Sequence, residues 1–192
     1  MTARLELLCH ASTGATRTAA FPDDEALEPQ ALLKLAALDF PFRDAARCWT
    51  SPALRAVQTA QFLRLGAGVE PKLAECGYGR WTGRPLAQVQ AEEPDAVALW
   101  LGDPASAPHG GESVLALLAR VAAWLDAQGG SPGRTLAVTH ASVIKAAILH
   151  AIGAPPRSFW RIDVAPLSLA KFIGDDGRWT LASIGPLPAR RG

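Results

Sequence analysis

Two apolar runs in this sequence each end at a histidine. The first, residues 5–8, leads through Cys9 to His10, and the second, residues 135–139, leads to His140. A short apolar run that stops at small and hydroxyl residues is typical of a buried strand that delivers a side chain to a loop. The repeated pattern predicts two neighbouring strand ends that each carry an imidazole, an arrangement suited to chemistry on an anion.

Helical spacing of apolar residues alternates with these strands. Ser51 followed by Pro52 predicts a helix start with Ser51 as the N-cap. Proline and glycine mark the other boundaries. The expected helices cover residues 30–38, 52–65, 85–101, 112–128 and 142–152, with a strand at 47–50 and a closing antiparallel hairpin at 168–173 and 179–184.

The alternation of strands and helices predicts the fold class. It is typical of an α/β protein, a three-layer α/β/α sandwich with a mostly parallel central sheet. In such sheets ligands bind outside the carboxyl ends of the strands. His10, Arg55 and His140 each follow a predicted strand, so this topology gathers them at one edge. Helix N-termini at Ser51 and Ala141 add partial positive charge and free amides, which favours a phosphate site.

Two longer segments lie outside the regular pattern. Residues 12–29 are polar and rich in turn residues, and compact domains rarely keep such loops without a function. Residues 70–111 are rich in glycine and proline, and we expect them to form an excursion that covers the strand ends. A chain of 192 residues is long enough for one domain and short for two, so we expect a single domain over 1–192.

The amino-acid composition limits the kinds of binding partner that we expect. A formal charge of +1 with 19% charged residues gives no reason to expect a nucleic acid or a membrane as the main partner. No apolar stretch has membrane-spanning length, and the first residues lack the pattern of a signal peptide. The cysteines Cys9, Cys48 and Cys76 show no CxxC spacing, so we expect no disulfide framework, no zinc site and a cytoplasmic location. The edge hairpin is compatible with a homodimer.

Four segments with reactive residues follow one another in a specific order. They are residues 8–13 (LCHAST), 51–60 (SPALRAVQTA), 73–83 (LAECGYGRWTG) and 138–141 (VTHA). In this order they resemble the histidine phosphatase superfamily, in its phosphoglycerate-mutase-like branch, over nearly the whole chain. The second segment is close to the family's form, and the third keeps its glutamate and glycine spacing. No single motif would suffice, but four in the correct order are a specific signal.

The resemblance implies a role for each matching residue. His10 would be the nucleophile, whose neutral imidazole attacks phosphorus and forms a phosphohistidine. Arg55 and His140 would hold the phosphoryl oxygens, because phosphoryl transfer depends on positioning and electrostatics. Glu75 would protonate the leaving oxygen and then help to deprotonate the attacking water. Thr13, in the first motif, would bind phosphate, and the reaction would need no metal and no cofactor.

The first motif departs from the family's form. The family has Arg-His-Gly where this chain has Cys9-His10-Ala11. The missing arginine normally contacts the phosphate, and the loss of such a contact costs about 3 kcal/mol of transition-state stabilisation. We hypothesise that Arg17, in the same loop, reaches back to restore the charge. Cys9 itself is not expected to be a nucleophile, because the Cys-x5-Arg spacing of cysteine-based phosphatases would need an arginine at Ala15.

These features predict a metal-independent phosphatase that hydrolyses a small phosphomonoester through a phosphohistidine on His10. Two alternatives remain. A phosphoglycerate-mutase-type phosphotransferase would use the same residues but retain the product for rephosphorylation. A non-catalytic phosphate-binding relative would be explained by the missing motif arginine. Sugar phosphates, nucleotide-related intermediates and ribazole phosphate all fit the pattern, because pockets of this family differ mainly in their covering loops.

Overall fold

A six-stranded sheet forms the centre of the molecule. The computed structural model describes residues 2–40, 45–129, 133–175 and 177–188. Within them the strand order is β3-β2-β4-β1-β5-β6. The strands are β1 (Ala3–Cys9), β2 (Arg47–Thr50), β3 (Gly68–Val69), β4 (Gly133–Thr139), β5 (Ser168–Asp175) and β6 (Arg178–Pro186).

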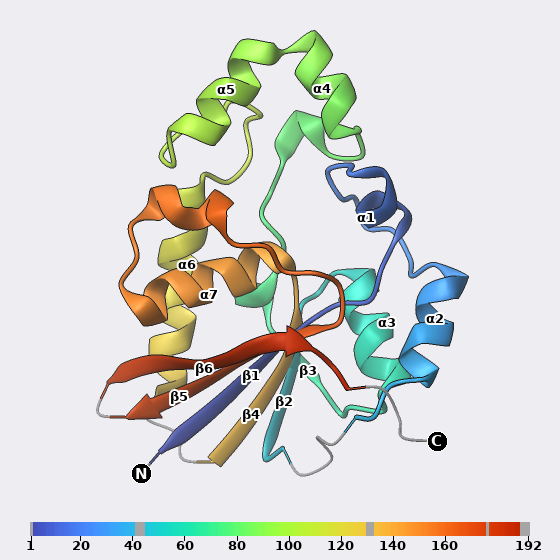
Figure 1. The fold of residues 1–192 in the computed structure, drawn as a ribbon, viewed down its shortest axis with the longest axis vertical. Helices are drawn as coiled ribbons and strands as arrows, with labels where there is room; N and C mark the ends of the chain where they lie inside the picture. Colours follow the sequence, from blue (N-terminus) through green and yellow to red (C-terminus); the bar gives the residue numbers. More distant parts are fainter. Residues whose placement is uncertain (1, 41–44, 130–132, 176, 189–192) are drawn as a thin grey trace.

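The predicted mostly parallel sheet is confirmed. The four strands from β3 to β1 pair in parallel, whereas β5 runs antiparallel to β1 and β6 runs antiparallel to β5. The last two strands are the expected hairpin at the sheet edge. Because β1 and β4 are parallel neighbours, their carboxyl ends lie side by side (Figure 1).

Helices cover both faces of the sheet, which confirms the α/β/α sandwich (Figure 1). Side chains of β1 alternate between the two faces of the sheet and contact the helices on each side. Leu5 and Leu7 pack into the cluster formed with α6 and α7, whereas Leu8 faces the cluster that includes Ala56 and Ala60 of α3. Side chains two apart in a strand share a face, so one buried strand joins the two layers. The helices are α1 (Gly14–Thr18), α2 (Pro29–Ala36), α3 (Leu54–Phe62), α4 (Leu86–Glu92), α5 (Pro94–Gly102), α6 (Val114–Gly129) and α7 (Ala141–Ile152).

The predicted N-cap at Ser51 is wrong. Helix α3 begins at Leu54, and the residue before it, Ala53, is the N-cap without a side-chain cap bond. The Ser51 hydroxyl instead contacts the imidazole of His140. A serine before a proline has the signature of a helix start, but here a tertiary contact uses the hydroxyl.

Two other segments have a different secondary structure from the one expected. The helix expected at 85–101 is two helices, α4 and α5, because Pro94 has no amide hydrogen and begins the second one. The segment 12–29, expected as a loop, holds the short helix α1, which Thr13 caps through a side-chain bond to the amide of Thr16.

Residues 70–111 stand beyond the carboxyl ends of the central strands and carry α4 and α5 (Figure 1). This segment packs around an aromatic cluster in which the ring centroids of Trp81 and Trp100 lie 5.7 Å apart, and Phe21 from outside the segment also belongs to the cluster. It closes on itself where Gly79, with a φ of 50°, passes the backbone of His109. A Cβ on Gly79 would lie 2.2 Å from the carbonyl oxygen of His109, so only glycine allows this approach.

Within the described ranges, no helix is both long and apolar enough to cross a lipid bilayer.

Candidate active site

The ends of β1 and β4 place the two predicted histidines next to each other. Cys9 pairs with Thr139 in the parallel register, and the amide of His10 donates to the Thr139 carbonyl over 2.9 Å. The next residue on each strand is a histidine, and the two ring centroids lie 5.1 Å apart. Both rings are buried, with 5% of His10 and none of His140 exposed. The strand pairing alone therefore brings residues 10 and 140 together.

His10 is held as a neutral imidazole. Its Nδ1 lies 2.7 Å from the carbonyl oxygen of Ala11, which can only accept, so Nδ1 carries the hydrogen and Nε2 keeps its lone pair. Burial, aided by the charge of Arg55, lowers the pKa of His10 to about 4. The Nε2 atom is thus an unprotonated nucleophile at neutral pH.

His140 is fixed by Ser51. The Ser51 hydroxyl lies 2.6 Å from Nε2 of His140 and accepts a hydrogen bond from the amide of Ala53. Its own hydrogen is then directed to Nε2, which favours the tautomer with the hydrogen on Nδ1. This Nδ1 is buried without a hydrogen-bond partner among the described residues. Burial, followed by the charges of neighbouring groups, lowers the pKa of His140 well below its usual value. A neutral N–H donor therefore points into the site.

Arg55 is the buried cation of the site. It is the second residue of α3 and only 2% exposed. Its Nε donates to Nε2 of His10 over 3.2 Å, and its Nη1 donates to the carbonyl of Asp23 over 2.7 Å. A cation in the first helical turn opposes the helix dipole, so these fixed acceptors explain its position.

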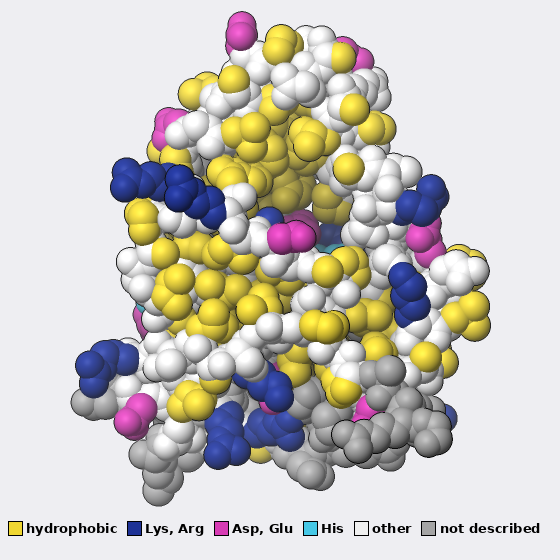
Figure 2. Space-filling model, in the orientation of Figure 1, with side chains coloured by type: hydrophobic (Ala, Val, Ile, Leu, Met, Phe, Trp, Pro, Cys, Tyr) yellow, Lys and Arg dark blue, Asp and Glu magenta, His cyan; other side chains and the backbone are white. Residues whose placement is uncertain are grey.

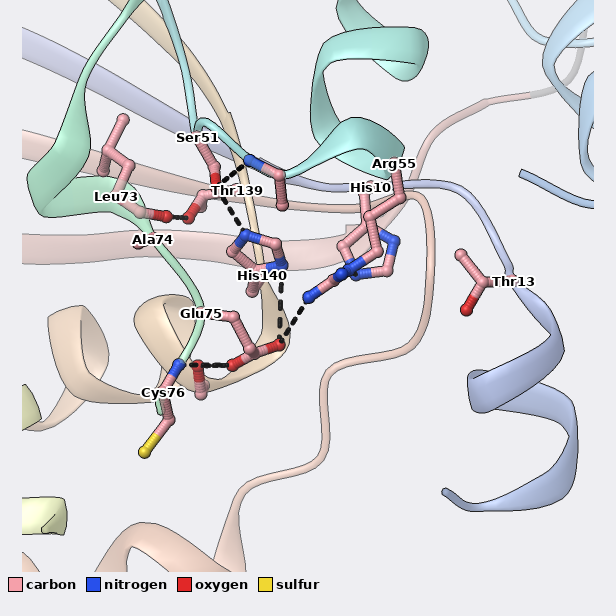
Figure 3. Close-up of polar contacts among 12 residues, drawn as sticks. His10, Thr13, Ser51, Arg55, Leu73, Ala74, Glu75, Cys76, Thr139 and His140 are labelled. Carbon is pink, nitrogen blue, oxygen red and sulfur yellow. Dashed lines mark hydrogen bonds and ion pairs between the residues drawn. The ribbon is translucent and has the colours of Figure 1, made fainter. Parts of the chain in front are cut away.

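Glu75 enters from residues 70–111. Its Oε2 lies 3.4 Å from Nδ1 of His140 and 3.7 Å from Nη2 of Arg55 (Figure 3). Its Oε1 accepts from the amide of Cys76 over 2.9 Å and from the Ser142 hydroxyl. Burial raises the pKa of Glu75 although these bonds and Arg55 oppose the shift. A carboxyl group that keeps its proton more readily is suited to general acid catalysis.

The loop that carries Glu75 is tied to the sheet and to α6. The Thr139 hydroxyl donates to the carbonyl of Leu73 over 2.8 Å, at the end of β4. Arg120 of α6 donates to the carbonyls of Lys72 and Ala74, over 2.7 and 3.1 Å. These bonds hold the backbone on the N-terminal side of Glu75. The position of its carboxyl group is therefore fixed by the sheet and by α6.

These groups face a small cavity of about 120 Å³. Figure 2 shows a hollow on this face in which charged side chains are visible among apolar ones. The cavity is lined by Cys9, His10, Thr13, Ala15, Thr16, Ala20, Pro22, Glu25, Arg55, Glu75, Ala141, Val164 and Pro166. His140 lies behind this lining with its Nδ1 toward Glu75.

Two of the predicted phosphate-binding residues, Thr13 and Arg17, each contact a glutamate instead of the histidines and Arg55. Thr13 lines the cavity, but its hydroxyl donates to Oε1 of Glu25 over 2.8 Å. Arg17 does not line the cavity, because its Nε pairs with Glu28 over 2.9 Å on the surface, where 68% of the arginine side chain is exposed. Arg17 therefore lies outside the group that the strand ends bring together, and its contact with a bound phosphate stays a prediction.

Sequence reasoning missed three polar residues of the site. Ser51 and Ser142 contact His140 and Glu75, and Glu25 is a second carboxylate in the cavity. Ser51 begins one recognised motif and Ser142 directly follows another, so their positions were a usable signal. Nothing in the pattern of residues 12–29 distinguishes Glu25 from its acidic neighbours, because only the path of the loop brings it inward.

Three side chains are also close enough to one another to share a metal ion. Donor atoms of His10, Glu75 and His140 all lie within 4.8 Å of one another. Arg55 disfavours such binding, because its Nε already donates to the His10 nitrogen that faces the site and its positive charge repels a cation. The arrangement is better suited to an anion that Arg55 can contact.

Comparison with known proteins agrees with this geometry. A family model described as the histidine phosphatase superfamily (branch 1) matches residues 5–185. The chain belongs to this superfamily. The resemblance inferred from the four motifs is thereby confirmed, and the predicted nucleophile, arginine and second histidine lie within the matched range.

Several known proteins are similar to this chain in sequence or in structure. A bifunctional protein of Mycobacterium tuberculosis is 33% identical over 134 residues, which is 66% of this chain and 37% of that protein, so the chain spans little more than a third of its length. A mycobacterial glucosyl-3-phosphoglycerate phosphatase, solved with VO3, has a TM-score of 0.79 at 25% identity over 97% of this chain and 99% of that one. A phosphoserine phosphatase from Entamoeba histolytica has a TM-score of 0.84 at 18% identity, over 95% and 96% of the two chains.

Cys9 brings a neutral side chain to the cavity. Cys9 is 2% exposed and lines the cavity. Burial, together with the charge of Glu75, raises the pKa of Cys9 to about 12, so the thiol is neutral. Among the described residues that line the cavity, Arg55 is the single arginine, beside two glutamates.

Proposed function

We propose that this protein hydrolyses a small phosphomonoester through a phosphohistidine on His10. The observation that carries the proposal is the state of that ring. Its Nδ1 is engaged by the Ala11 carbonyl, its Nε2 faces Arg55 and the cavity, and its pKa is lowered to about 4. A buried neutral imidazole beside a fixed guanidinium is suited to nucleophilic attack on an anion.

The first step would transfer the phosphoryl group to the enzyme. The lone pair of His10 Nε2 forms a bond to phosphorus while the bond from phosphorus to the ester oxygen breaks. Glu75 gives its proton to that oxygen, so the alcohol leaves neutral. Arg55 and the Nδ1 hydrogen of His140 would stabilise the phosphoryl oxygens, because both donors are already in place beside Glu75 and His10.

The second step would release phosphate. Water attacks phosphorus and gives its proton to the Glu75 carboxylate, and the bond between phosphorus and Nε2 breaks. This returns the imidazole and the protonated Glu75 to their starting states. The position of Glu75 Oε2 within 3.7 Å of Arg55 supports both roles, because one carboxyl group near the phosphoryl site can serve the leaving oxygen and the water in turn.

The presence of Cys9 favours a second candidate function, in which the protein binds phosphate but does not hydrolyse phosphate esters. A neutral buried thiol stands where the family's motif has a guanidinium, so one charge-assisted contact is absent. Such a protein would bind phosphate or vanadate but would not hydrolyse esters. A mutase-type phosphotransferase would pass the phosphoryl group to a second alcohol instead of water.

Hydrolysis of 4-nitrophenyl phosphate in the presence of a chelator tests the proposal. We expect turnover by the wild type, none by His10→Ala, and near wild-type turnover by His150→Ala. His150 is a suitable control because it pairs with Asp126 at the far end of α7. Vanadate binding without turnover would instead support the non-catalytic candidate, and transfer to an added alcohol in preference to water would support the phosphotransferase.

A further inference from the structure

Glu25 is a carboxylate of the cavity that the proposed reaction does not use. It lies in the segment between α1 and α2 and faces the same space as Arg55 and Glu75. Its Oε1 accepts from the Thr13 hydroxyl over 2.8 Å. Its Oε2 is buried and has no hydrogen-bond partner among the described residues. The nearest cation, Nη1 of Arg55, lies 3.9 Å away, which is longer than a hydrogen bond.

The backbone around Glu25 is fixed to α3. Nη1 of Arg55 donates to the carbonyl of Asp23, and the amide of Leu54 donates to the Asp24 carboxylate, each over 2.7 Å. The amide of Leu27 donates to the side chain of Gln58 over 2.8 Å. Because bonds on both sides of Glu25 hold the loop, its carboxylate is directed into the cavity by the fold.

Glu25 creates a problem for a phosphate ligand. A phosphoryl dianion held by Arg55 would lie beside a second negative charge, and the Cys9 thiol is neutral. Like charges at this separation repel strongly in a water-poor site. A buried acceptor without a donor is also unfavourable. Both costs are removed when the ligand itself brings a positive donor to Oε2.

We propose that Glu25 selects phosphomonoesters that carry a protonated amine close to the ester oxygen, with its Oε2 accepting a hydrogen bond from that ammonium group. The inference rests on the proposed function, because it places the phosphoryl group against His10 and Arg55. Glu25 is then a specificity-determining residue that binds the alcohol portion of the substrate.

The geometry limits the distance between the two charged groups of the substrate. Oε2 of Glu25 lies 3.9 Å from Nη1 of Arg55, and Oε2 of Glu75 lies 3.7 Å from Nη2 of the same guanidinium. The phosphoryl group therefore has a carboxylate at each side of its arginine. Glu75 serves the ester oxygen, so the amine that reaches Glu25 must follow within a few bonds. The cavity of about 120 Å³ also favours a short amino alcohol.

An ammonium group fits better than a hydroxyl group. Either can donate to Oε2, but a hydroxyl leaves the negative charge of Glu25 beside the phosphoryl group uncompensated. An ammonium group also adds a Coulomb attraction to the carboxylate that a neutral hydroxyl group does not have. The amine is therefore the chemical feature that the site recognises.

Calorimetric binding to the His10→Ala variant tests this inference, because that variant cannot turn the ligand over. The probes are 2-aminoethyl phosphate, propyl phosphate of nearly the same shape, and 2-hydroxyethyl phosphate. The same titrations are made with His10→Ala/Glu25→Gln. His10→Ala/Glu28→Gln is the matched control, because Glu28 pairs with Arg17 outside the cavity.

We expect 2-aminoethyl phosphate to bind at least about tenfold more tightly than either other probe, and Glu25→Gln to bring the three affinities within about twofold of one another. The Glu28→Gln control should keep the preference. Equal binding of the three probes, a preference that survives Glu25→Gln, or no binding of any probe at millimolar concentration would each overturn the inference. Turnover by the wild type is measured separately. If the binding preference holds and no hydrolysis occurs, the role of Glu25 stands and the proposed hydrolysis fails.

Discussion

Arg55 donates a hydrogen bond from its Nε to the Nε2 atom of His10 over 3.2 Å. The proposed phosphate-binding group thus holds the lone pair of the proposed nucleophile in place. Burial and this positive charge both oppose protonation of the ring, so the pKa of His10 falls to about 4. A phosphoryl group that binds Arg55 would take over this donor and leave the lone pair of His10 free to attack phosphorus.

The first prediction concerns the pH dependence of kcat/KM. His10 must be neutral to attack, so activity should fall as the pH drops toward its pKa of about 4. Glu75 must be protonated to serve the leaving oxygen, so activity should fall as the pH rises above its raised pKa. A pH profile with an alkyl phosphate checks both limbs, with circular dichroism as the control for folding. An acidic limb near the ordinary histidine pKa would contradict the buried neutral state of His10.

The second prediction separates the two roles of Glu75. Glu75→Gln removes the proton donor but keeps the bond from Ser142 possible. We expect kcat for a simple alkyl phosphate to fall about 100-fold or more, because its leaving group needs a proton. The first chemical step with 4-nitrophenyl phosphate should fall much less, because nitrophenolate leaves without one. Burst kinetics measure that step, and equal losses for both substrates would remove the general acid role.

The third prediction concerns the substituted motif. Cys9→Arg introduces the guanidinium that the family resemblance implies at this position, and we expect about tenfold tighter binding of vanadate. Cys9→Ser should change little, because the thiol is neutral. Vanadate inhibition and melting temperature are measured together, since Cys9 also packs in the core below the site. Loss of turnover in a folded Cys9→Ser protein would show instead that the sulfur takes part in the reaction.

The fourth prediction links the buried histidines to stability. The pKa values of His10 and His140 are both below that of an unfolded histidine, so between these values the unfolded chain binds more protons than the folded one. The free energy of unfolding should therefore be largest above about pH 6.5 and decrease as the pH falls toward about 4. His140→Gln should weaken this dependence. Urea unfolding at several pH values measures it, and an unchanged slope in His140→Gln would contradict the assignment.

The sequence predicted the centre of this site because strand order determines it. His10 and His140 follow two apolar runs that pair in register, so pattern and topology were sufficient. Arg55 could be placed for the same reason, since it lies in the first turn of the helix after β2. Glu75 required the resemblance to a family, because its position depends on hydrogen bonds from Thr139 and Arg120 to the neighbouring backbone.

The sequence did not predict the details that depend on loop paths. Proximity along the chain suggested that Arg17 could reach the strand end, but α1 directs it to Glu28. Glu25 has no periodic signal, and its place in the cavity depends on bonds between its loop and α3. Pro94 divided a helix that apolar spacing had suggested was continuous. Long-range contacts of irregular segments decide each of these points.

The central claim is that His10 carries the phosphoryl group, and direct detection of the intermediate tests it. The Glu75→Gln variant is mixed with 4-nitrophenyl phosphate, quenched in alkali, digested and analysed by mass spectrometry. The good leaving group allows the first step, and the missing base slows hydrolysis, so the intermediate should accumulate. We predict an acid-labile phosphoryl group on the peptide that holds His10, absent from the His10→Ala/Glu75→Gln variant. Steady hydrolysis by His10→Ala, or a phosphoryl group on another residue, would contradict the mechanism.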